Sequence, residues 1–361
     1  MKKKIIFFCP SIEKGGVEKN FFLIINSLSN LFNVELITAS NIKSRINSKI
    51  NCTIKSPKFI HNFPRFFKSI YCFVFSLIRL NKKILLISFE SNIFAVLAAK
   101  IIGAKVIIRS NASPKGYLNF LKKNVFKFFF QKADLVLVNS YDFKKNIDKI
   151  FKINSKVIYN SLENSSNIKK LSSRKVKLNY KSNSKEFRLI SIGRLVPQKD
   201  HLTLLKALNL LKKKINFQLI IIGNGKLRNN LEEFCIKNQL IDKVKFLGYK
   251  PNIYPYLKWS DALVLSSLFE GSPNVILEAI SMKKLVISSN CETGPKEILQ
   301  NGLGGYLFKT SNYKDLAKKI EYSFLNKKKN RKKIDSSFKT LYKYQLNNNL
   351  NNFINLINQL K

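Results

Sequence analysis

Residues 266–279 read SSLFEGSPNVILEA. The apolar run at 262–265 predicts a buried strand, and the Ser-Pro pair at 272–273 predicts the start of a helix. Serine is a favoured N-cap, and proline at the first helical position loses no hydrogen bond because that N–H would be unpaired in any case. The amides of Asn274 and Val275 would then lie at the positive end of the helix, where an anion such as phosphate binds.

Two glutamates flank this predicted anion site. Glu270 lies on the loop before it, and Glu278 lies one helical turn inside it. A carboxylate repels phosphate but accepts hydrogen bonds from hydroxyl groups, so the layout matches the ribose, diphosphate and sugar of a nucleotide-sugar. The alternative is an ordinary strand–turn–helix unit whose glutamates are solvated, since the spacing alone is common.

Two more segments in the same half follow strands. Residues 191–200, SIGRLVPQKD, place Arg194 and Lys199 on one strand-to-helix loop. Residues 292–298, ETGPKEI, end another strand and are followed by the glycine-rich stretch 301–307. In a chain so rich in lysine, the alternative for Lys199 is a solvated surface charge. Arginine is rare in this chain, so Arg194 is the stronger indication of a functional cation.

In their order and context, these segments resemble the retaining glycosyltransferases of family four, also called glycosyltransferase group 1. The resemblance extends over nearly the whole C-terminal half. It is weaker in the N-terminal half, where residues 15–18, GGVE, are the main match. It implies an α/β protein with the GT-B fold, in which two Rossmann-like parallel-sheet domains face each other across a cleft. The chain looks most similar to bacterial hexosyl- and N-acetylhexosaminyltransferases of surface-glycan assembly.

The resemblance assigns roles to matching positions. Arg194 and Lys199 would hold the donor diphosphate and neutralise the charge that grows on the leaving nucleotide, a major catalytic term in many enzymes. Glu270, the third catalytic candidate, would bind hydroxyls of the transferred sugar, and Glu278 would bind the ribose. The other donor-binding candidates are Gly16, Gly193, Tyr249, Lys250, Gly271, Ser272, Pro273, Asn274 and Val275.

By the same resemblance, the sugar keeps its anomeric configuration through a same-face, oxocarbenium-like step without a protein nucleophile. No metal or other cofactor is expected, because the arginine, the lysine and the helix start do what a divalent cation does in other enzymes. The sequence has no convincing Asp-x-Asp motif, which agrees with this expectation.

The sequence departs from the family pattern in the N-terminal half. Many members have a histidine after the strand that corresponds to 106–108, whereas this chain continues with Arg109 and has no histidine there. Arg109 and Asn111, together with Gly15, are therefore the candidates for contact with the sugar or the acceptor. The two histidines of the chain, His61 and His201, are expected to be structural or exposed rather than catalytic.

Short apolar runs alternate with helical patterns in both halves, which predicts two parallel sheets. The runs lie at 5–9, 34–38, 84–88, 106–109, 135–139 and 157–159, and then at 187–192, 217–222, 244–247, 262–265, 285–288 and 305–308. We predict an N-terminal acceptor domain at 1–165, a linker rich in Asn, Ser and Lys at 166–186, a nucleotide-sugar domain at 187–334, and a tail at 335–361 whose helix crosses back to the first domain.

Composition limits the other possibilities. Five cysteines without a C-x-x-C pair and two histidines make a zinc site implausible and suit a reducing cytoplasm. The apolar run at 5–9 is too short for a signal peptide, and no run is long enough for a transmembrane helix. We therefore expect a cytoplasmic protein, peripherally associated with the inner face of the cytoplasmic membrane.

The formal net charge of +44 has two explanations. One is a polyanionic partner, either nucleic acid or an anionic membrane surface, and the other is the composition of an AT-rich genome. Nucleic acid is not expected, because no helix-turn-helix, zinc-finger or RNA-binding pattern occurs. Residues 63–79 and 117–130 combine aromatic residues with cations and predict helices in the membrane interface, unless they are ordinary helices packed on the first sheet.

The predicted function is the metal-independent, retaining transfer of a hexose or N-acetylhexosamine. The donor would be a nucleotide-sugar, UDP-linked, and the acceptor a lipid-linked saccharide in lipopolysaccharide, capsule or related polysaccharide synthesis. Two alternatives remain open at this point. One is another nucleotide-sugar enzyme of the same architecture, such as an epimerase, and the other is a basic membrane- or nucleic-acid-binding protein with an inactive transferase fold.

Overall fold

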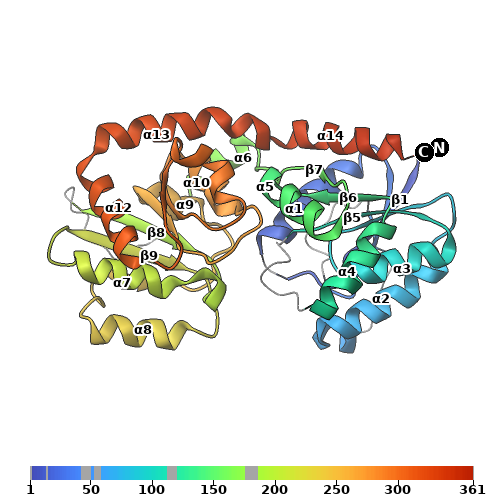
Figure 1. Ribbon diagram of the computed structural model, residues 1–361, viewed down its shortest axis with the longest axis horizontal. Coiled ribbons are helices and arrows are strands. Elements are labelled where there is room, and N and C mark those ends of the chain that lie inside the picture. Colours follow the sequence, from blue (N-terminus) through green and yellow to red (C-terminus); the bar gives the residue numbers. More distant parts are fainter. Residues whose placement is uncertain are drawn as a thin grey trace. The chain divides into compact units, whose positions relative to one another are not determined.

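A computed structural model describes residues 2–13, 15–41, 50–52, 58–111, 120–174 and 186–360. The chain forms two compact units, and each has its own parallel β-sheet (Figure 1). The first unit contains residues 1–161 and 345–361, and the second contains residues 162–344. The predicted α/β class with two parallel sheets is therefore confirmed.

The sheet of the first unit has the strand order β3-β2-β1-β4-β5-β6-β7. Its strands are β1 (Lys4–Phe8), β2 (Asn33–Ile37), β3 (Asn51–Cys52), β4 (Leu85–Ser88), β5 (Lys105–Arg109), β6 (Leu135–Val138) and β7 (Lys156–Val157). Its helices are α1 (Gly16–Leu28), η1 (Lys58–Asn62), α2 (Arg65–Arg79), α3 (Asn92–Ile102), α4 (Phe120–Lys132), α5 (Tyr141–Phe151) and α14 (Leu346–Gln359).

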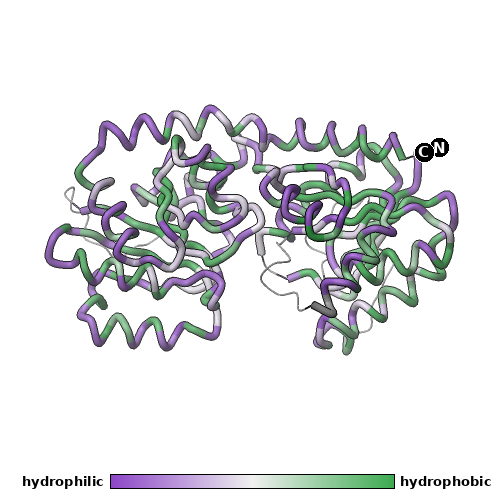
Figure 2. The backbone as a smooth tube through the Cα atoms, in the orientation of Figure 1, coloured by the Kyte–Doolittle hydropathy of each residue, from purple (hydrophilic) through white to green (hydrophobic). Residues whose placement is uncertain are grey.

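Helices cover both faces of this sheet because its central strands are hydrophobic along their whole length (Figure 2). On one face, α2 to α5 enclose a core that includes Cys72, Ala98 and Phe130. On the other face, α1 and α14 contribute Phe21 and Phe353 to a second core. The last helix of the chain thus belongs to the first unit.

The sheet of the second unit has the order β10-β9-β8-β11-β12-β13. Its strands are β8 (Phe187–Ile192), β9 (Phe217–Ile222), β10 (Val244–Phe246), β11 (Ala262–Leu265), β12 (Leu285–Ser289) and β13 (Tyr306–Phe308). Its helices are α6 (Ser165–Ser172), η3 (Pro197–Lys199), α7 (His201–Leu211), α8 (Arg228–Lys237), α9 (Tyr254–Trp259), α10 (Asn274–Ser281), α11 (Pro295–Ile298), η4 (Gln300–Gly302), α12 (Tyr313–Leu325), α13 (Lys327–Lys339) and η5 (Thr340–Tyr344).

The segment predicted as a linker, 166–186, contains a helix. Helix α6 occupies its first part, Ile168 is buried, and the carbonyl of Leu171 accepts a hydrogen bond of 2.8 Å from Asn252 Nδ2. This helix packs on the second unit through a buried isoleucine and a hydrogen bond to its backbone. Such packing needs few apolar residues, so the composition of the segment did not indicate a helix. Residues 175–185 of the predicted linker lie outside the described residues.

The predicted tail, 335–361, is divided between the two units. Its first part completes α13 and forms η5 in the second unit, where Tyr344 is buried. The first unit resumes at Gln345, immediately before α14. Helical spacing continues through both parts of the tail, so the sequence pattern did not indicate this change of unit.

Helix α4 covers most of the segment 117–130, whose first residues lie outside the described part of the chain. Phe130 is buried in the core, and Phe126 packs against that core. Val125 and Phe128 remain exposed. On its inner side α4 is therefore an ordinary core helix, as the alternative interpretation of this segment proposed.

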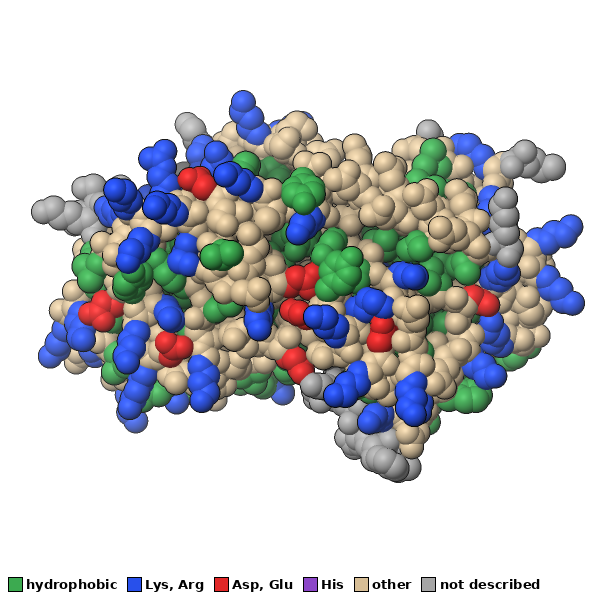
Figure 3. All heavy atoms as spheres, turned by 45° about the horizontal axis from the view of Figure 1, so that its top comes forward, with side chains coloured by type: hydrophobic (Ala, Val, Ile, Leu, Met, Phe, Trp, Pro, Cys, Tyr) green, Lys and Arg blue, Asp and Glu red, His purple; other side chains and the backbone are tan. Residues whose placement is uncertain are grey.

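Lysine and arginine side chains are spread over both units, among fewer acidic ones (Figure 3). None of the described helices is both long and apolar enough to cross a membrane. On the face that Figure 3 shows, charge alone does not single out either unit.

Replacing Phe353 by alanine should destabilise the first unit. The ring is fully buried between α14 and the sheet, so Phe353→Ala should lower the free energy of unfolding by about 3–5 kcal/mol. Urea denaturation followed by circular dichroism measures this loss. Asn355→Ala, at an exposed position of the same helix, is the matched control. Equal stability of the two variants would contradict a structural role for α14.

Candidate functional site

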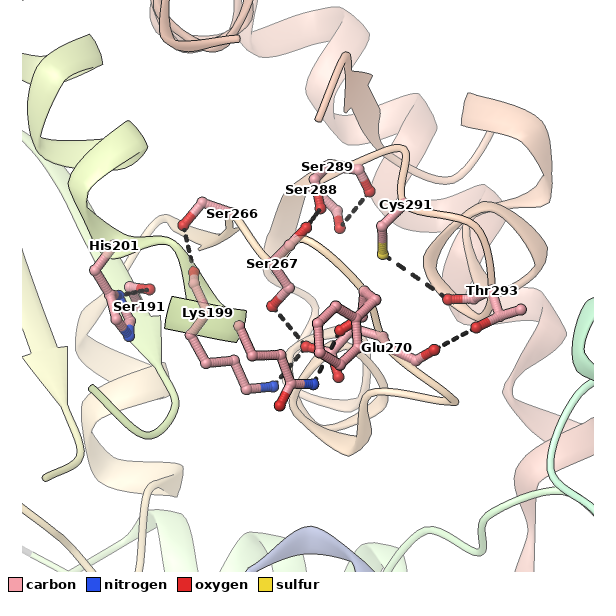
Figure 4. Close-up of polar contacts among 12 residues, drawn as sticks. Ser191, Lys199, His201, Ser266, Ser267, Glu270, Ser288, Ser289, Cys291 and Thr293 are labelled. Atoms are coloured by element: carbon pink, nitrogen blue, oxygen red, sulfur yellow. Dashed lines mark hydrogen bonds and ion pairs between the residues drawn. The ribbon is translucent and has the colours of Figure 1, made fainter. Parts of the chain in front are cut away.

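Three loops of the second unit meet at one edge of its sheet. They follow β8, β11 and β12, which are neighbours in the sheet, and ligands of open parallel sheets bind beyond the carboxyl ends of the strands. Lys199 lies on the first loop, Glu270 on the second and Thr293 on the third (Figure 4). The predicted catalytic residues Lys199 and Glu270 are thus brought together.

Lys199 and Glu270 form a buried ion pair. The distance between Lys199 Nζ and Glu270 Oε1 is 2.5 Å, and the two side chains are 16% and 8% exposed. The hydroxyl of Ser267 donates to the same carboxylate oxygen at 2.6 Å. A buried carboxylate needs such partners to stay ionised, so Lys199 and Ser267 together stabilise the negative charge of Glu270.

Hydrogen bonds to the backbone connect the loops after β11 and β12. The hydroxyl of Thr293 donates to the carbonyl of Glu270. Ser289 Oγ donates to the carbonyl of Ser267 at 2.6 Å. These bonds hold the backbone on both sides of the Glu270 carboxylate, so the position of this carboxylate depends on the neighbouring strand.

The loops after β8 and β11 are connected in the same way. The amide of Leu268 donates to the carbonyl of Gln198 at 2.8 Å, and Gln198 Nε2 donates to the carbonyl of Phe269 at 2.9 Å. Ser266 Oγ donates to the carbonyl of Lys199 at 3.0 Å. These bonds hold the two loops together beside the Lys199–Glu270 pair.

Two glycines allow these loops to approach closely. A Cβ on Gly294, whose φ is +89°, would lie 2.5 Å from the carbonyl oxygen of Gly271 and 2.8 Å from Pro273 Cδ. A Cβ on Gly223 would lie 1.9 Å from the carbonyl oxygen of Gly193. Any side chain at either position would push apart the backbone that carries predicted donor-binding residues.

Helix α10 begins one residue later than predicted. Pro273 is the N-cap with an extended backbone, and Asn274 is the first helical residue, whereas the sequence suggested that Ser272 caps the helix. Proline has no N–H, and here it stands before the helix rather than inside it. The amides of Asn274 and Val275 still belong to the first turn, and both residues are half-buried.

Glu278 lies in the second turn of α10 and is buried, as are Gly271 and Ser272 on the preceding loop. Along the chain, the helix start thus lies between two buried glutamates, Glu270 before it and Glu278 within α10. The anion site that the sequence suggested between them stays a prediction.

Arg194 is exposed at the end of β8, next to Gly193. Within the described part of the chain its guanidinium forms no ion pair and no side-chain hydrogen bond, so its charge is available to a ligand. The loop that carries Tyr249 and Lys250 is joined to the same edge, because the amide of Gly223 donates to the carbonyl of Gly248 at 3.0 Å.

His201 is buried behind Lys199. Its Nδ1 atom lies 3.3 Å from Ser191 Oγ, and its Nε2 atom has no hydrogen-bond partner among the described residues. Burial, and then the positive charge of Lys199, lower the pKa of His201 to about 4. The ring is therefore neutral near pH 7 and supports the loop, as expected for a structural histidine.

The candidates Gly15, Gly16, Arg109 and Asn111 belong to the first unit. Gly15 caps α1, and Gly16 is its first residue. Arg109 is only 1% exposed, and its Nη2 atom donates to the carbonyl of Ile158 at 3.1 Å.

The guanidinium of Arg109 thus points into the protein. Its Nε atom donates to Asn111 Oδ1 at 3.2 Å, and burial lowers its pKa to about 10. Direct contact between this buried side chain and an acceptor, which the sequence suggested, is not available in this conformation. Asn111 keeps its place as a candidate, because it is only partly buried and Arg109 orients it.

Sequence reasoning missed the hydroxyl residues that hold Glu270, namely Ser267, Ser289 and Thr293. A signal existed, since small hydroxyl residues follow both β11 and β12. It also missed Glu90, just beyond β4 in the first unit. Glu90 pairs with Arg65 at 2.9 Å, and burial raises the pKa of this carboxyl to about 7.

Two units, each with a parallel sheet covered by helices, are the architecture of the GT-B fold. HepE of Anabaena, solved in complex with UDP and glucose, matches 99% of this chain and 100% of its own with a TM-score of 0.77. The two sequences are 17% identical, so this likeness concerns the fold.

Residues 173–340 match the family model described as glycosyl transferases group 1. A glycosyltransferase of Methanocaldococcus jannaschii is 37% identical over 179 residues, which are 48% of this chain and 44% of that protein. A Campylobacter jejuni protein is 25% identical over 99% of both chains. Its name describes an α-1,4-N-acetyl-D-galactosaminyltransferase acting on a saccharide linked to PP-undecaprenol. The chain thus carries a glycosyltransferase domain.

The buried state of His201 predicts its titration. Its pKa is about 4 in the folded chain against 6.5 for an ordinary histidine, so the unfolded chain takes up the proton first. Stability should therefore fall as the pH drops from 7 towards 4. In an NMR titration of a His61→Gln variant, the remaining histidine ring should stay neutral at pH 5.5. Protonation there with a midpoint near 6.5 would contradict the burial.

Proposed function

We propose that the protein transfers a hexose or N-acetylhexosamine from a nucleotide-sugar, UDP-linked, to a lipid-linked saccharide in the synthesis of a surface polysaccharide. The observation that carries the proposal is the Lys199–Glu270 pair beside the start of α10. It provides a cation for the diphosphate and a carboxylate for sugar hydroxyls within one site of a group 1 domain.

The comparisons support the kind of substrate. The Campylobacter jejuni relative is named for an acceptor linked to PP-undecaprenol, and another relative, from Rhizobium meliloti, is named for lipopolysaccharide core biosynthesis. HepE, which shares the fold, was solved with UDP. We extend these substrate classes to this chain as a proposal.

Lys199 and Arg194 would act on the donor diphosphate. An ammonium has three N–H donors, so Lys199 can keep its bond to Glu270 while it donates to a phosphate oxygen. The ion pair fixes the ammonium before the donor arrives, and a cation held in place costs no reorganisation as charge develops on the leaving group. Arg194, exposed at the same edge, adds a second positive charge.

Glu270 and Glu278 would select the two ends of the donor. Glu270 has a second carboxylate oxygen, Oε2, besides the one that Lys199 and Ser267 contact, and it can accept a hydrogen bond from a sugar hydroxyl. Glu278, inside α10, would accept from the ribose. The amides of Asn274 and Val275 would face the diphosphate between them.

We further propose that transfer retains the anomeric configuration and requires no metal. The bond between the sugar and the leaving phosphate breaks as the acceptor oxygen approaches the same face. The acceptor proton passes to a phosphate oxygen of the leaving nucleotide diphosphate. No protein group is assigned as nucleophile. A lipid-linked acceptor would place the enzyme on the cytoplasmic side of a membrane, peripherally attached.

Alanine substitution should separate the roles of the two glutamates. Glu278→Ala should raise the KM for the donor with little change in kcat, because it removes ground-state contacts. Glu270→Ala should lower kcat by about two to three orders of magnitude, because it misplaces the sugar and Lys199. Steady-state kinetics with the nucleotide-sugar that gives the largest thermal stabilisation measure both effects.

Glu292→Ala, at an exposed position of the third loop, is the matched control. Wild-type kinetics for both glutamate variants would refute the assignment of the site. Hydrolysis or epimerisation of the donor with no transfer to any lipid-linked saccharide would refute the proposed reaction.

Removal of either cation should slow transfer without a metal requirement. Arg194→Ala and Lys199→Ala should each lower kcat by about two to three orders of magnitude, whereas Lys296→Ala, on an exposed lysine nearby, should not. Wild-type enzyme should stay active in EDTA. Loss of activity in EDTA that manganese restores would overturn the metal-free mechanism.

A further inference from the structure

Helix α2 of the first unit presents several large apolar side chains outward. Phe67 and Val74 are each 53% exposed, and Ile78 is 75% exposed. Its other side packs on the core through the small buried residues Ser69, Cys72 and Ser76 and through larger, half-buried side chains, namely Tyr71, Phe73, Phe75 and Leu77. The helix therefore covers the sheet with one side and has a second apolar face without a partner in the described chain.

An apolar groove of about 360 Å³ runs along this face between η1 and α2. It is lined by side chains that include Phe59, Phe63, Phe67, Ile70, Val74 and Ile78. The aromatic rings form a continuous row, with centroids 5.9 Å apart for Phe59 and Phe63 and 6.1 Å apart for Phe63 and Phe67. We refer to these six residues as the η1–α2 face.

Positive charge surrounds this face without any acidic residue in the same segment. Residues 58–83 contain no aspartate or glutamate, and their cationic residues are Lys58, Arg65, Lys68, Arg79, Lys82 and Lys83. Arg65 and Arg79, at the two ends of α2, are exposed but lie near carboxylates of other segments, Arg65 at 2.9 Å from Glu90 and Arg79 at 4.0 Å from Glu35. Lys82 and Lys83, just after α2, are exposed as well. Arg79 lies 5.6 Å over the ring of Phe75, so its charge stands beside the apolar surface.

We propose that the η1–α2 face binds the surface of an anionic phospholipid bilayer. Exposed aromatic and aliphatic side chains with cations at both ends are the features of a helix that lies in a membrane interface. A second copy of the chain is a poor occupant, because two faces of the same positive charge repel each other. A neutral groove partner would leave the exposed lysines after α2, Lys82 and Lys83, without a counter-charge from the ligand.

Helix α4 exposes fewer apolar side chains than α2 and should contribute less to membrane binding. Its exposed apolar residues are Val125 and Phe128, whereas Phe126 and Phe130 pack towards the core. Lysines are spread over both units, so charge attracts the whole molecule to an anionic surface but does not orient it. The exposed apolar row of α2 supplies the orientation.

The proposal rests on the proposed function in one respect, which is that the acceptor is held in a bilayer. Adsorption itself is measured without donor or acceptor. Failure of vesicle binding therefore refutes the η1–α2 face alone, and failure of sugar transfer by a vesicle-bound enzyme refutes the proposed function alone.

The test is flotation of the full chain with vesicles of phosphatidylglycerol and phosphatidylcholine in equal parts. The triple variant Phe67→Ser, Val74→Ser, Ile78→Ser should reduce vesicle binding by about tenfold or more, with an unchanged melting temperature because the three residues are exposed. Ile236→Ser with Leu325→Ser, at exposed apolar positions of the second unit, is the matched control and should bind like wild type.

Charge variants complete the experiment. Because the apolar row orients the molecule, charges beside it lie nearest to the bilayer, so Lys82→Glu with Lys83→Glu should weaken binding more than Lys123→Glu with Lys127→Glu on α4, and added salt should reduce the difference. Equal binding of wild type and the apolar triple variant, or no binding of wild type at low salt, would overturn the proposal. A concentration-dependent dimer in sedimentation that the triple variant abolishes would also overturn it, in favour of a second copy.

Discussion

The buried contact between Lys199 and Glu270 organises the site of the second unit. Each charge would be costly in the interior without the other, and Ser267 adds a second donor to the same carboxylate oxygen. The partners come from the ends of β8 and β11, and Thr293 adds the end of β12. The geometry of the site therefore depends on which strands are neighbours in the sheet, because no single sequence motif contains all of these residues.

Much of this arrangement could be predicted from local pattern. Apolar runs of three to six residues indicated the strands other than β3, and the Ser-Pro pair indicated the start of α10 to within one residue. The contact between Lys199 and Glu270 could not be predicted from spacing, because 71 positions separate the two residues. Only the parallel pairing of β8 with β11 brings their loops together.

Which face of an amphipathic helix packs on the sheet could not be predicted from the sequence either. The segments that became α2 and α4 are both rich in phenylalanine and both carry cations, and either face of each was able to cover the sheet. In α2 the small residues, such as Ser69 and Cys72, pack inward, whereas α4 buries Phe130. The close packing of the core selects the face, and this depends on neighbouring helices that the segment's own pattern does not describe.

The division of the chain between its units has a consequence for how the protein is made. The second unit is one continuous stretch, whereas the first is interrupted and closes its core with Phe353 and Ile357 of α14. A ribosome therefore releases every residue of the second unit before it releases the helix that completes the first. The N-terminal segments emerge from the ribosome first, but one face of their sheet stays uncovered until α14 has been synthesised. During this period the uncovered face exposes apolar surface to which a chaperone can bind.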